Sequence, residues 1–359
     1  MAKPTESFPA SLKSLVILLL IICIVFILII GKNIFIPLFL AGLFSIILTP
    51  LGEQFEKWGL GRTNSTILTV LSGLITILLI LGFSVLQVVS FRKDLENVGE
   101  KLNAYLQSFD SFIFERFNIE TGLGEGIDQA YLIDLIESNG STIAQVILGT
   151  IGSLSSFILL PIFIFFFLLY RGHLTEFFVK LLSNQNSEKV KTEIKELRKL
   201  IQNYIVGVLK VMFILAVLNS IALFSLGIKH AIFFAVFAAI LNIIPYLGPL
   251  MGAVLPTVFA FLTKDGLFYP IAVVACFQLI QLIESNFLTP KIVGSNVNLN
   301  AFVTFLGLLV GASIWGIAGM IIIIPTMAIL RKIFELTDST KPYAFLLGEE
   351  ETKKSEDTT

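Results

Sequence analysis

The chain has 359 residues, of which 55% are hydrophobic and only 14% are charged, and its formal net charge is −1. An average soluble domain has about 25% charged residues. The lower charged fraction of this chain and its mean hydropathy of +0.89 exclude an ordinary soluble domain. Several runs of about 20 apolar residues instead predict an all-α polytopic membrane protein. The sequence has no basic patch rich in aromatic residues, so it does not indicate a nucleic-acid partner.

The first half of the chain, residues 1–170, is predicted to be a scaffold and oligomerisation domain of four membrane spans. The first apolar run is followed by Lys32 and a second span instead of a cleavage site, so we expect it to be retained rather than removed as a signal peptide. Residues 92–142 have apolar side chains at helical spacing and are predicted to form an extracytoplasmic amphipathic segment. The four spans are predicted at residues 15–30, 34–51, 67–91 and 143–170.

Residues 171–202 are predicted to form a cytoplasmic amphipathic helix. They contain Arg171, Lys180, Lys189, Lys191, Lys195, Arg198 and Lys199. Because loops rich in lysine and arginine stay in the cytoplasm, this segment orients the chain. Counting spans from it places both termini in the cytoplasm, and residues 335–359 are predicted to be a partly disordered cytoplasmic tail.

A long apolar segment at residues 231–262 is the most informative part of the chain. As one helix it would be roughly 48 Å long, whereas the hydrocarbon core of a bilayer is about 30 Å thick. Pro245, Gly248 and Pro249 lie at its middle, where they would break a helix. We therefore expect a re-entrant helical hairpin, with a kinked single span as the alternative. Such broken helices are typical of substrate sites in transporters.

A second apolar segment, residues 299–330, has the same design. It is interrupted by Gly311, Ser313, Gly316 and Gly319. One ordinary span precedes each segment, at residues 204–226 and 267–288. We therefore expect an inverted repeat of helix plus hairpin, which together make a transport domain over residues 203–334. The fold is predicted to have six full spans and two re-entrant hairpins, or eight spans of which two are broken.

The residues that could carry chemistry lie around these segments. Glu284 is a carboxyl group at membrane depth, where a charge is costly and needs a reason. Gln281 is three residues earlier and shares its helix face, and Lys291 is its expected charged partner. Glu284 could carry a proton, or it could be a structural group near the interface. Asn242 precedes the first break and could bind the hydroxyl groups of a ligand.

No enzyme motif is present in the membrane segments. The sequence has no HExxH, no G-x-S-x-G, no P-loop and no Ser/His/Asp set. We therefore expect neither enzymatic activity nor a cofactor. His173 and His230 have no third ligand type nearby, so no metal site is predicted.

Three motifs carry a resemblance to a known family. They are IPYLGP at residues 244–249, ESNFLTPKIVG at residues 284–294, and GIAG at residues 316–319, ahead of Pro325. In these motifs the chain resembles the autoinducer-2 exporter (AI-2E) family. The resemblance implies a bacterial inner-membrane exporter of a small polar signalling molecule, a furanone-derived polyol. It also implies a ring-shaped homo-oligomer such as a pentamer, and an elevator-like movement of the hairpin domain.

Three functions follow from these observations. The first is export of an autoinducer-2-like polyol by a secondary transporter. The second is exchange of sodium or another cation for protons, with Glu284 as the proton carrier, because some relatives are associated with that activity. The third is a membrane scaffold that transports nothing. The predicted solute-binding residues are Asn242, Pro245, Gly248, Pro249, Gln281, Glu284, Ser313, Gly316 and Gly319.

Overall fold

The computed structural model describes residues 10–94, 107–108, 110–111, 113–117, 154–182, 187–244, 247–293, 299–335 and 338–349. These residues are helical except for short connections and one bridge between Leu299 and Gly348, and no strand forms among them. The predicted amphipathic segment at residues 92–142 lies for the most part outside the described residues.

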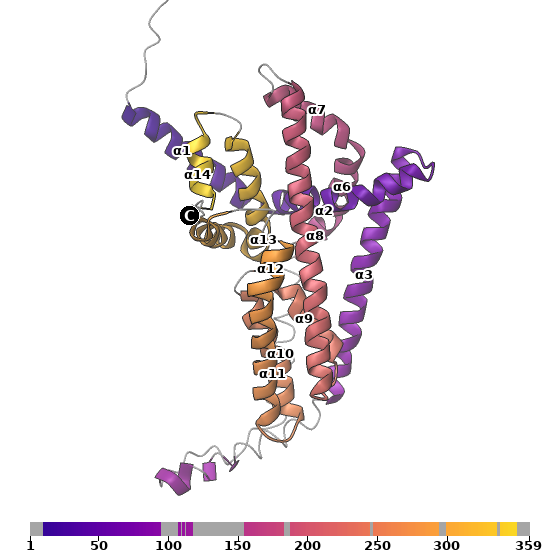
Figure 1. Ribbon diagram of the computed structural model, residues 1–359, viewed down its shortest axis with the longest axis vertical. Coiled ribbons are helices and arrows are strands. Elements are labelled where there is room, and N and C mark those ends of the chain that lie inside the picture. The colour runs from indigo at the N-terminus through magenta and orange to yellow at the C-terminus, as the bar shows by residue number, and fades with distance from the viewer. Residues whose placement is uncertain are drawn as a thin grey trace, which may run out of the picture. The chain divides into compact units, whose positions relative to one another are not determined.

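The chain divides into two compact units. The first unit comprises Met1–Ser45, Gly149–Leu174 and Leu299–Thr359, and the second comprises Ile46–Leu148 and Thr175–Asn298. The helices are α1 (Ala10–Ile30), α2 (Lys32–Lys57), α3 (Arg62–Asp94), α6 (Leu154–Leu169), α7 (Arg171–Leu182), α8 (Ser187–Ser225), α9 (Ala231–Leu241), α10 (Leu247–Thr263), α11 (Phe268–Ile283), η2 (Glu284–Leu288), α12 (Thr289–Ile292), α13 (Ala301–Glu335) and α14 (Lys341–Leu347) (Figure 1). The division into domains predicted from the sequence stays a prediction.

Five of the described helices are long and apolar enough to cross a membrane, or six if the bent pair α6 and α7 counts as one span. The predicted third span lies within α3, and the sixth corresponds to α11 continued through η2 and α12. The predicted fourth span falls partly outside the described residues. A multi-pass membrane protein is therefore confirmed. The number of spans stays open because length alone counts α13 as a single span.

The helix α8 joins two segments that the sequence analysis kept apart. It runs without a break for 39 residues, from the charged segment into the predicted fifth span. At 1.5 Å per residue it is roughly 58 Å long, about twice the thickness of the hydrocarbon core. Its charged N-terminal part must therefore extend beyond the membrane.

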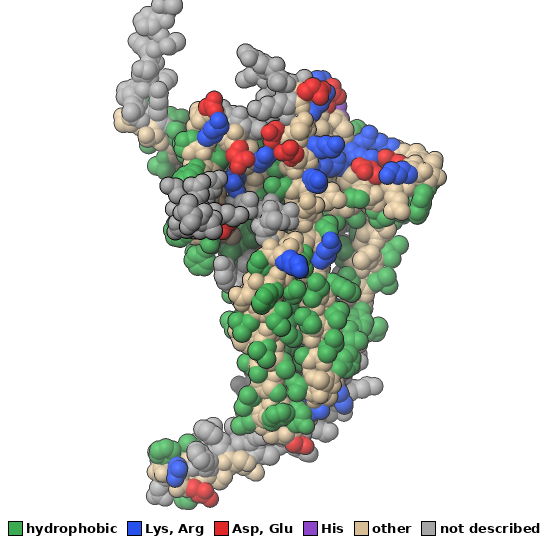
Figure 2. All heavy atoms as spheres, in the orientation of Figure 1, with side chains coloured by type: hydrophobic (Ala, Val, Ile, Leu, Met, Phe, Trp, Pro, Cys, Tyr) green, Lys and Arg blue, Asp and Glu red, His purple; other side chains and the backbone are tan. Residues whose placement is uncertain are grey.

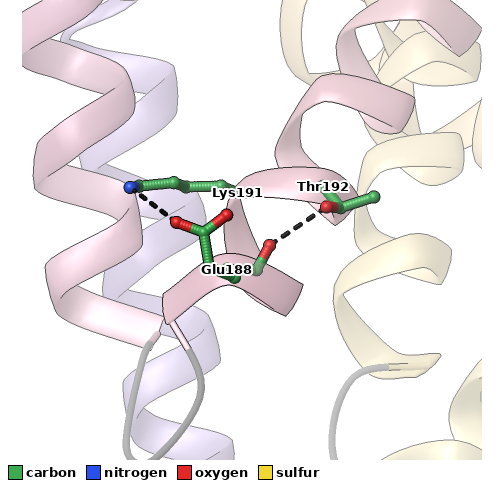
Figure 3. A network of polar contacts seen from close by, with 3 residues as sticks. All are labelled: Glu188, Lys191 and Thr192. Atoms are coloured by element: carbon green, nitrogen blue, oxygen red, sulfur yellow. Dashed lines mark hydrogen bonds and ion pairs between the residues drawn. The ribbon is translucent and has the colours of Figure 1, made fainter.

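The first turn of α8 is closed by local contacts (Figure 3). The Lys191 ammonium lies 3.1 Å from the Glu188 carboxylate, and the Thr192 hydroxyl donates to the Glu188 backbone carbonyl at 3.0 Å. An acidic side chain in a first turn also complements the positive end of the helix dipole. Since both charged side chains are exposed, this ion pair contributes little stability.

The predicted first hairpin is formed by α9 and α10, which pack against each other in opposite directions. A Cβ atom added to Gly252 would lie 2.9 Å from the Cβ of Ala238, and one added to Gly248 would overlap the carbonyl oxygen of Leu241. In a straight helix Ala238 and Gly252 would be about 21 Å apart. The chain therefore doubles back between α9 and α10, as the sequence predicted.

The predicted second hairpin is hidden within α13. The backbone leaves the helical region at Trp315 and at Gly316, whose φ of 60° is in the left-handed region that favours glycine. A Cβ on Gly311 would lie 2.7 Å from the carbonyl oxygen of Gly319, although eight helical residues span about 12 Å. The two halves of α13 therefore fold back on each other at Trp315–Gly316.

The tip of this second hairpin is held by the first unit's own helices. The Trp315 indole N–H donates to the carbonyl oxygen of Leu28 at 2.9 Å, and its ring lies 5.5 Å from that of Phe39. Leu28 is in the last turn of α1, where carbonyl groups lack a partner within the helix. The indole therefore satisfies an acceptor that the helix end leaves open.

The core of the second unit surrounds the first hairpin. Helices α8, α9, α10 and α11 lie side by side (Figure 1). Phe234 of α9 is fully buried, and its ring centroid lies 5.1 Å from that of Phe259 of α10. The outer faces of α10 and α11 are covered with exposed apolar side chains (Figure 2), including Leu250 and Ile271. A continuous apolar surface of this kind is suited to lipid.

The contact between Gly311 and Gly319 leads to a stability prediction. Replacing Gly319 with alanine puts a methyl group into the Gly311 carbonyl, so the second hairpin must separate. We expect a loss of about 1–3 kcal/mol, as for other overpacked sites, seen as a lower Tm of the detergent-purified protein. Gly42→Ala is the control, because nothing lies within 4 Å of a Cβ at that position. An unchanged Tm for G319A would contradict the folded-back arrangement.

Candidate functional site

A small cavity lies in the second unit, beside the break between α9 and α10. It is lined by Leu215, Asn219, Ala238, Asn242, Pro249, Gly252, Phe277, Ile280 and Gln281. These residues come from α8, from both arms of the first hairpin and from α11. Three amides, from Asn219, Asn242 and Gln281, supply its polar side chains. No charged residue lines it.

The cavity is small. It leaves about 20 Å³ for the centres of water-sized spheres, while about 10–15 Å³ of such space is enough for one water molecule. A molecule as large as a sugar does not fit in it without movement of the surrounding helices.

Asn219 is the most deeply placed of the three amides. Its side chain is 5% exposed, and its Oδ1 atom has no hydrogen-bond partner among the described residues. A buried amide oxygen without a partner costs about 1–3 kcal/mol. Such a cost is compensated when a ligand or a water molecule supplies a donor.

Gln281 connects the cavity with Glu284. Its Nε2 atom donates to Oε2 of Glu284 at 2.6 Å, as their spacing of three residues predicted. The other carboxylate oxygen of Glu284 accepts a hydrogen bond from the hydroxyl of Thr289. Glu284 is only 7% exposed, so its carboxyl group is buried and bonded to two neutral donors.

The turn η2 explains why Thr289 reaches Glu284. Residues Glu284–Leu288 form a π-helical turn, which is wider than an α-helical one. It lies just before Pro290, which has no N–H to donate and whose ring crowds the carbonyl of Asn286, four residues earlier. The backbone N–H of Thr289 donates to the backbone carbonyl oxygen of Glu284, five residues earlier in the chain. The widened turn therefore places Thr289 beneath Glu284.

The expectation that Lys291 pairs with Glu284 was wrong. Lys291 is exposed, and the structure gives Glu284 two neutral partners instead. The physical reason is the π-helical turn, which fills the position beside the carboxylate with the Thr289 hydroxyl. Lysine can also keep its ammonium group in water by extending its flexible side chain.

Helix α12 lies close to α8 because of Gly207. A Cβ at this position would be 3.0 Å from the carbonyl oxygen of Ile292 and 3.3 Å from the side chain of Val293. Val293 is buried together with Val211 and Leu215 of α8. This packing fixes α11, η2 and α12 against the helix that carries Asn219.

The predicted site residues are distributed over both units. Asn242, Pro249 and Gln281 line the cavity, while Gly248 packs against Leu241 at the hairpin break. Pro245 lies outside the described residues.

The other predicted site residues belong to the second hairpin, in the first unit. Ser313 is exposed and its hydroxyl donates to the carbonyl of Leu309 at 2.8 Å. Gly316 is exposed at the turn, and Gly319 is buried against Gly311.

Sequence reasoning missed two participants. Asn219 was not among the predicted solute-binding residues, although a polar amide on the buried face of a span also indicates a site. Thr289 carried no signal, because its position depends on the π-helical turn. Within the described residues, no group of three or more His, Cys, Asp or Glu side chains could hold a metal ion.

Comparison with known proteins identifies the family. The model of the AI-2E family transporters matches residues 15–338. Relatives include YrrI of Bacillus subtilis strain 168, 27% identical over 310 residues that cover 84% of this chain and 85% of YrrI. Another is the AI-2 transport protein TqsA of Escherichia coli K12, 23% identical over 353 residues that cover 97% of this chain and 99% of TqsA. With this match over most of its length and its several apolar helices, the chain belongs to the AI-2E family of membrane transporters.

Proposed function

We propose that this chain is a secondary transporter that exports a small polyhydroxylated signalling solute of the autoinducer-2 type across the bacterial inner membrane. The observation that carries the proposal is the uncharged cavity at the break of the first hairpin, with amides from α8, from α11 and from the turn that follows α9. Each amide can both donate and accept, and so can each hydroxyl group of a polyol. A concave site with apolar walls and a few placed polar groups suits such a ligand.

The relative TqsA supports the solute class, since it is an AI-2 transport protein and matches nearly the full length of this chain. The likeness extends over both hairpins, which fall within the matched residues. In this proposal Asn242, Pro249 and Gln281 contact the solute directly, whereas Pro245 and Gly248 shape the break.

Transport then requires the cavity to open. Space for little more than one water molecule cannot hold a polyol, so the first hairpin must move relative to α8 and α11. Ser313, Gly316 and Gly319 of the second hairpin are proposed as further solute contacts, as the sequence analysis expected. The hairpins would move together in an elevator-like step, as parts of an inverted repeat.

The arrangement in the membrane completes the proposal. Both termini would lie in the cytoplasm, because the basic segment at the start of α8 is expected to stay there. The exposed apolar surface of α1 and α3 would serve for lipid contact and for association into a homo-oligomer such as a pentamer.

The proposal predicts that Asn242→Leu slows transport. Leucine has a similar volume but removes one amide from the cavity, so we expect saturable efflux of an autoinducer-2-type polyol from proteoliposomes to fall about tenfold, the equivalent of one hydrogen bond of about 1.4 kcal/mol. Asn203→Leu, an exposed position on α8 outside the cavity, is the matched control. Equal flux through both variants would show that the cavity is not part of the transport path.

A second candidate function, cation–proton exchange, is favoured by Glu284. A buried carboxyl group in a candidate membrane span is the usual kind of proton carrier in transporters. Its two neutral partners would hold it in place without an opposite charge.

Glu284→Gln separates the two functions. The glutamine has nearly the same shape and keeps hydrogen-bonding capacity toward both partners, so the fold should be retained. If the protein is an exchanger, we expect sodium-driven proton movement, followed with a pH-sensitive dye in proteoliposomes, to fall to the background of empty vesicles. Polyol flux that persists in this variant would exclude Glu284 as an obligatory proton carrier. A folded protein that moves neither solute nor ions would point to the scaffold function.

A further inference from the structure

Two exposed lysine side chains lie where α8 meets α12. A Cβ at Gly207 of α8 would be 3.0 Å from the carbonyl oxygen of Ile292, so the two helices touch at this point. Lys210 follows Gly207 by three residues, about 4.5 Å along the helix axis, and Lys291 directly precedes Ile292. The two lysines are therefore at nearly the same depth, one on each helix. Figure 2 shows basic side chains over α8 and α12, at the border of a wide apolar area.

No carboxylate neutralises these two lysines in the part of the chain that the structure describes. Neither has a hydrogen-bond or ion-pair partner there. Helix α8 has no acidic residue after Glu196, and α11, η2 and α12 contain only Glu284. Glu284 is buried and accepts hydrogen bonds from Gln281 and Thr289 instead. The junction of α8 and α12 therefore presents two positive charges.

The depth of this junction matches the edge of a membrane. The candidate span Phe268–Ile292 has 25 residues and is roughly 37 Å long, whereas the hydrocarbon core is about 30 Å thick. Both of its ends therefore reach the headgroup regions. At the first end, the Lys264 ammonium lies 5.1 Å from the centre of the Tyr269 ring, and tyrosine is enriched at membrane interfaces. Lys291 marks the opposite headgroup region, together with Lys210.

Each lysine is followed, toward the membrane centre, by an exposed phenylalanine of the same helix. Phe213 is three residues after Lys210 and is 71% exposed, and Phe287 is four residues before Lys291 and is 68% exposed. Helices α8 and α11 run in opposite directions (Figure 1), so both rings lie on the same side of the lysines. Positive charge at the surface with apolar rings beneath it matches the order of a phospholipid, which has a phosphate above its acyl chains.

We propose that Lys210 and Lys291 bind the phosphate of an anionic phospholipid, whose acyl chains lie against Phe213 and Phe287. Lysine binds phosphate as a point charge, and its flexible stem allows both ammonium groups to reach one phosphate. The helical segment that ends at Ile292 has a partial negative charge at this end, which offsets part of the charge of Lys291. The site therefore needs both lysines, and it does not depend on which solute is transported.

The test measures binding to the full-length protein in a neutral detergent, as the rise in Tm with the concentration of each compound. The compounds are dioctanoyl phosphatidylglycerol, dioctanoyl phosphatidylcholine and glycerol 3-phosphate, which has a phosphate but no acyl chain. The test variants are Lys210→Gln/Lys291→Gln, which removes both charges, and Lys210→Arg/Lys291→Arg, which keeps them. The matched control Lys180→Gln/Lys191→Gln removes two charges from exposed lysines that already have carboxylate partners.

We expect wild type and the control to bind phosphatidylglycerol at least about tenfold more tightly than phosphatidylcholine, because choline adds a positive charge. Each lysine near an anionic headgroup contributes about fivefold in affinity. The double glutamine variant should therefore bind phosphatidylglycerol about 25-fold more weakly, while the double arginine variant keeps the preference. A purely structural role for the lysines would lower Tm without lipid and leave the ratio of the two lipid affinities unchanged, which would contradict the proposal.

Three other outcomes would also overturn the proposal. Equal affinity of wild type for the two lipids, or an equal loss of binding in the control, would show that no local site recognises the headgroup. Glycerol 3-phosphate binding as tightly as phosphatidylglycerol would assign the lysines to a soluble phosphate compound. A double glutamine variant that elutes as a smaller species in size-exclusion chromatography, with its lipid preference intact, would show that the lysines join subunits instead.

Discussion

The close approach of backbone to backbone at glycine is the constraint on which both hairpins depend. Where Gly248 meets Leu241, and where Gly319 meets Gly311, a side chain would occupy the space of a carbonyl group. Moving an apolar helix surface from lipid into contact with another helix gains little free energy. The association of such helices therefore relies on this close packing. It brings distant parts of the sequence together, and in the second unit it forms one wall of the amide-lined cavity.

The sequence predicted the hairpins because length and composition conflict with a single span. Prolines and glycines at the middle of residues 231–262 located the first break, and Gly316 has the positive φ that a sharp turn requires. The contact between Gln281 and Glu284 also followed from their spacing. These features are local, so periodicity and residue type are enough to find them.

Features that depend on several elements could not be predicted in this way. Asn219 could be placed in a span, but periodicity does not say which helix its buried face meets. In a regular α-helix, Thr289 would lie about 140° round the axis from Glu284, which made Lys291 the more plausible partner. The π-helical turn before Pro290 changes that angle. The surroundings of Glu284 therefore follow from a departure from regular geometry that residue spacing does not reveal.

The length of α8 has a mechanical consequence. One unbroken helix connects Lys191, in its charged part, with Asn219 at the cavity, a separation of 28 residues or roughly 42 Å. A rigid rod transmits rotation along its whole length. A force on the aqueous end, whether from a binding protein or from lipid headgroups, would therefore be transmitted to Asn219, so α8 can act as a lever between the aqueous phase and the cavity.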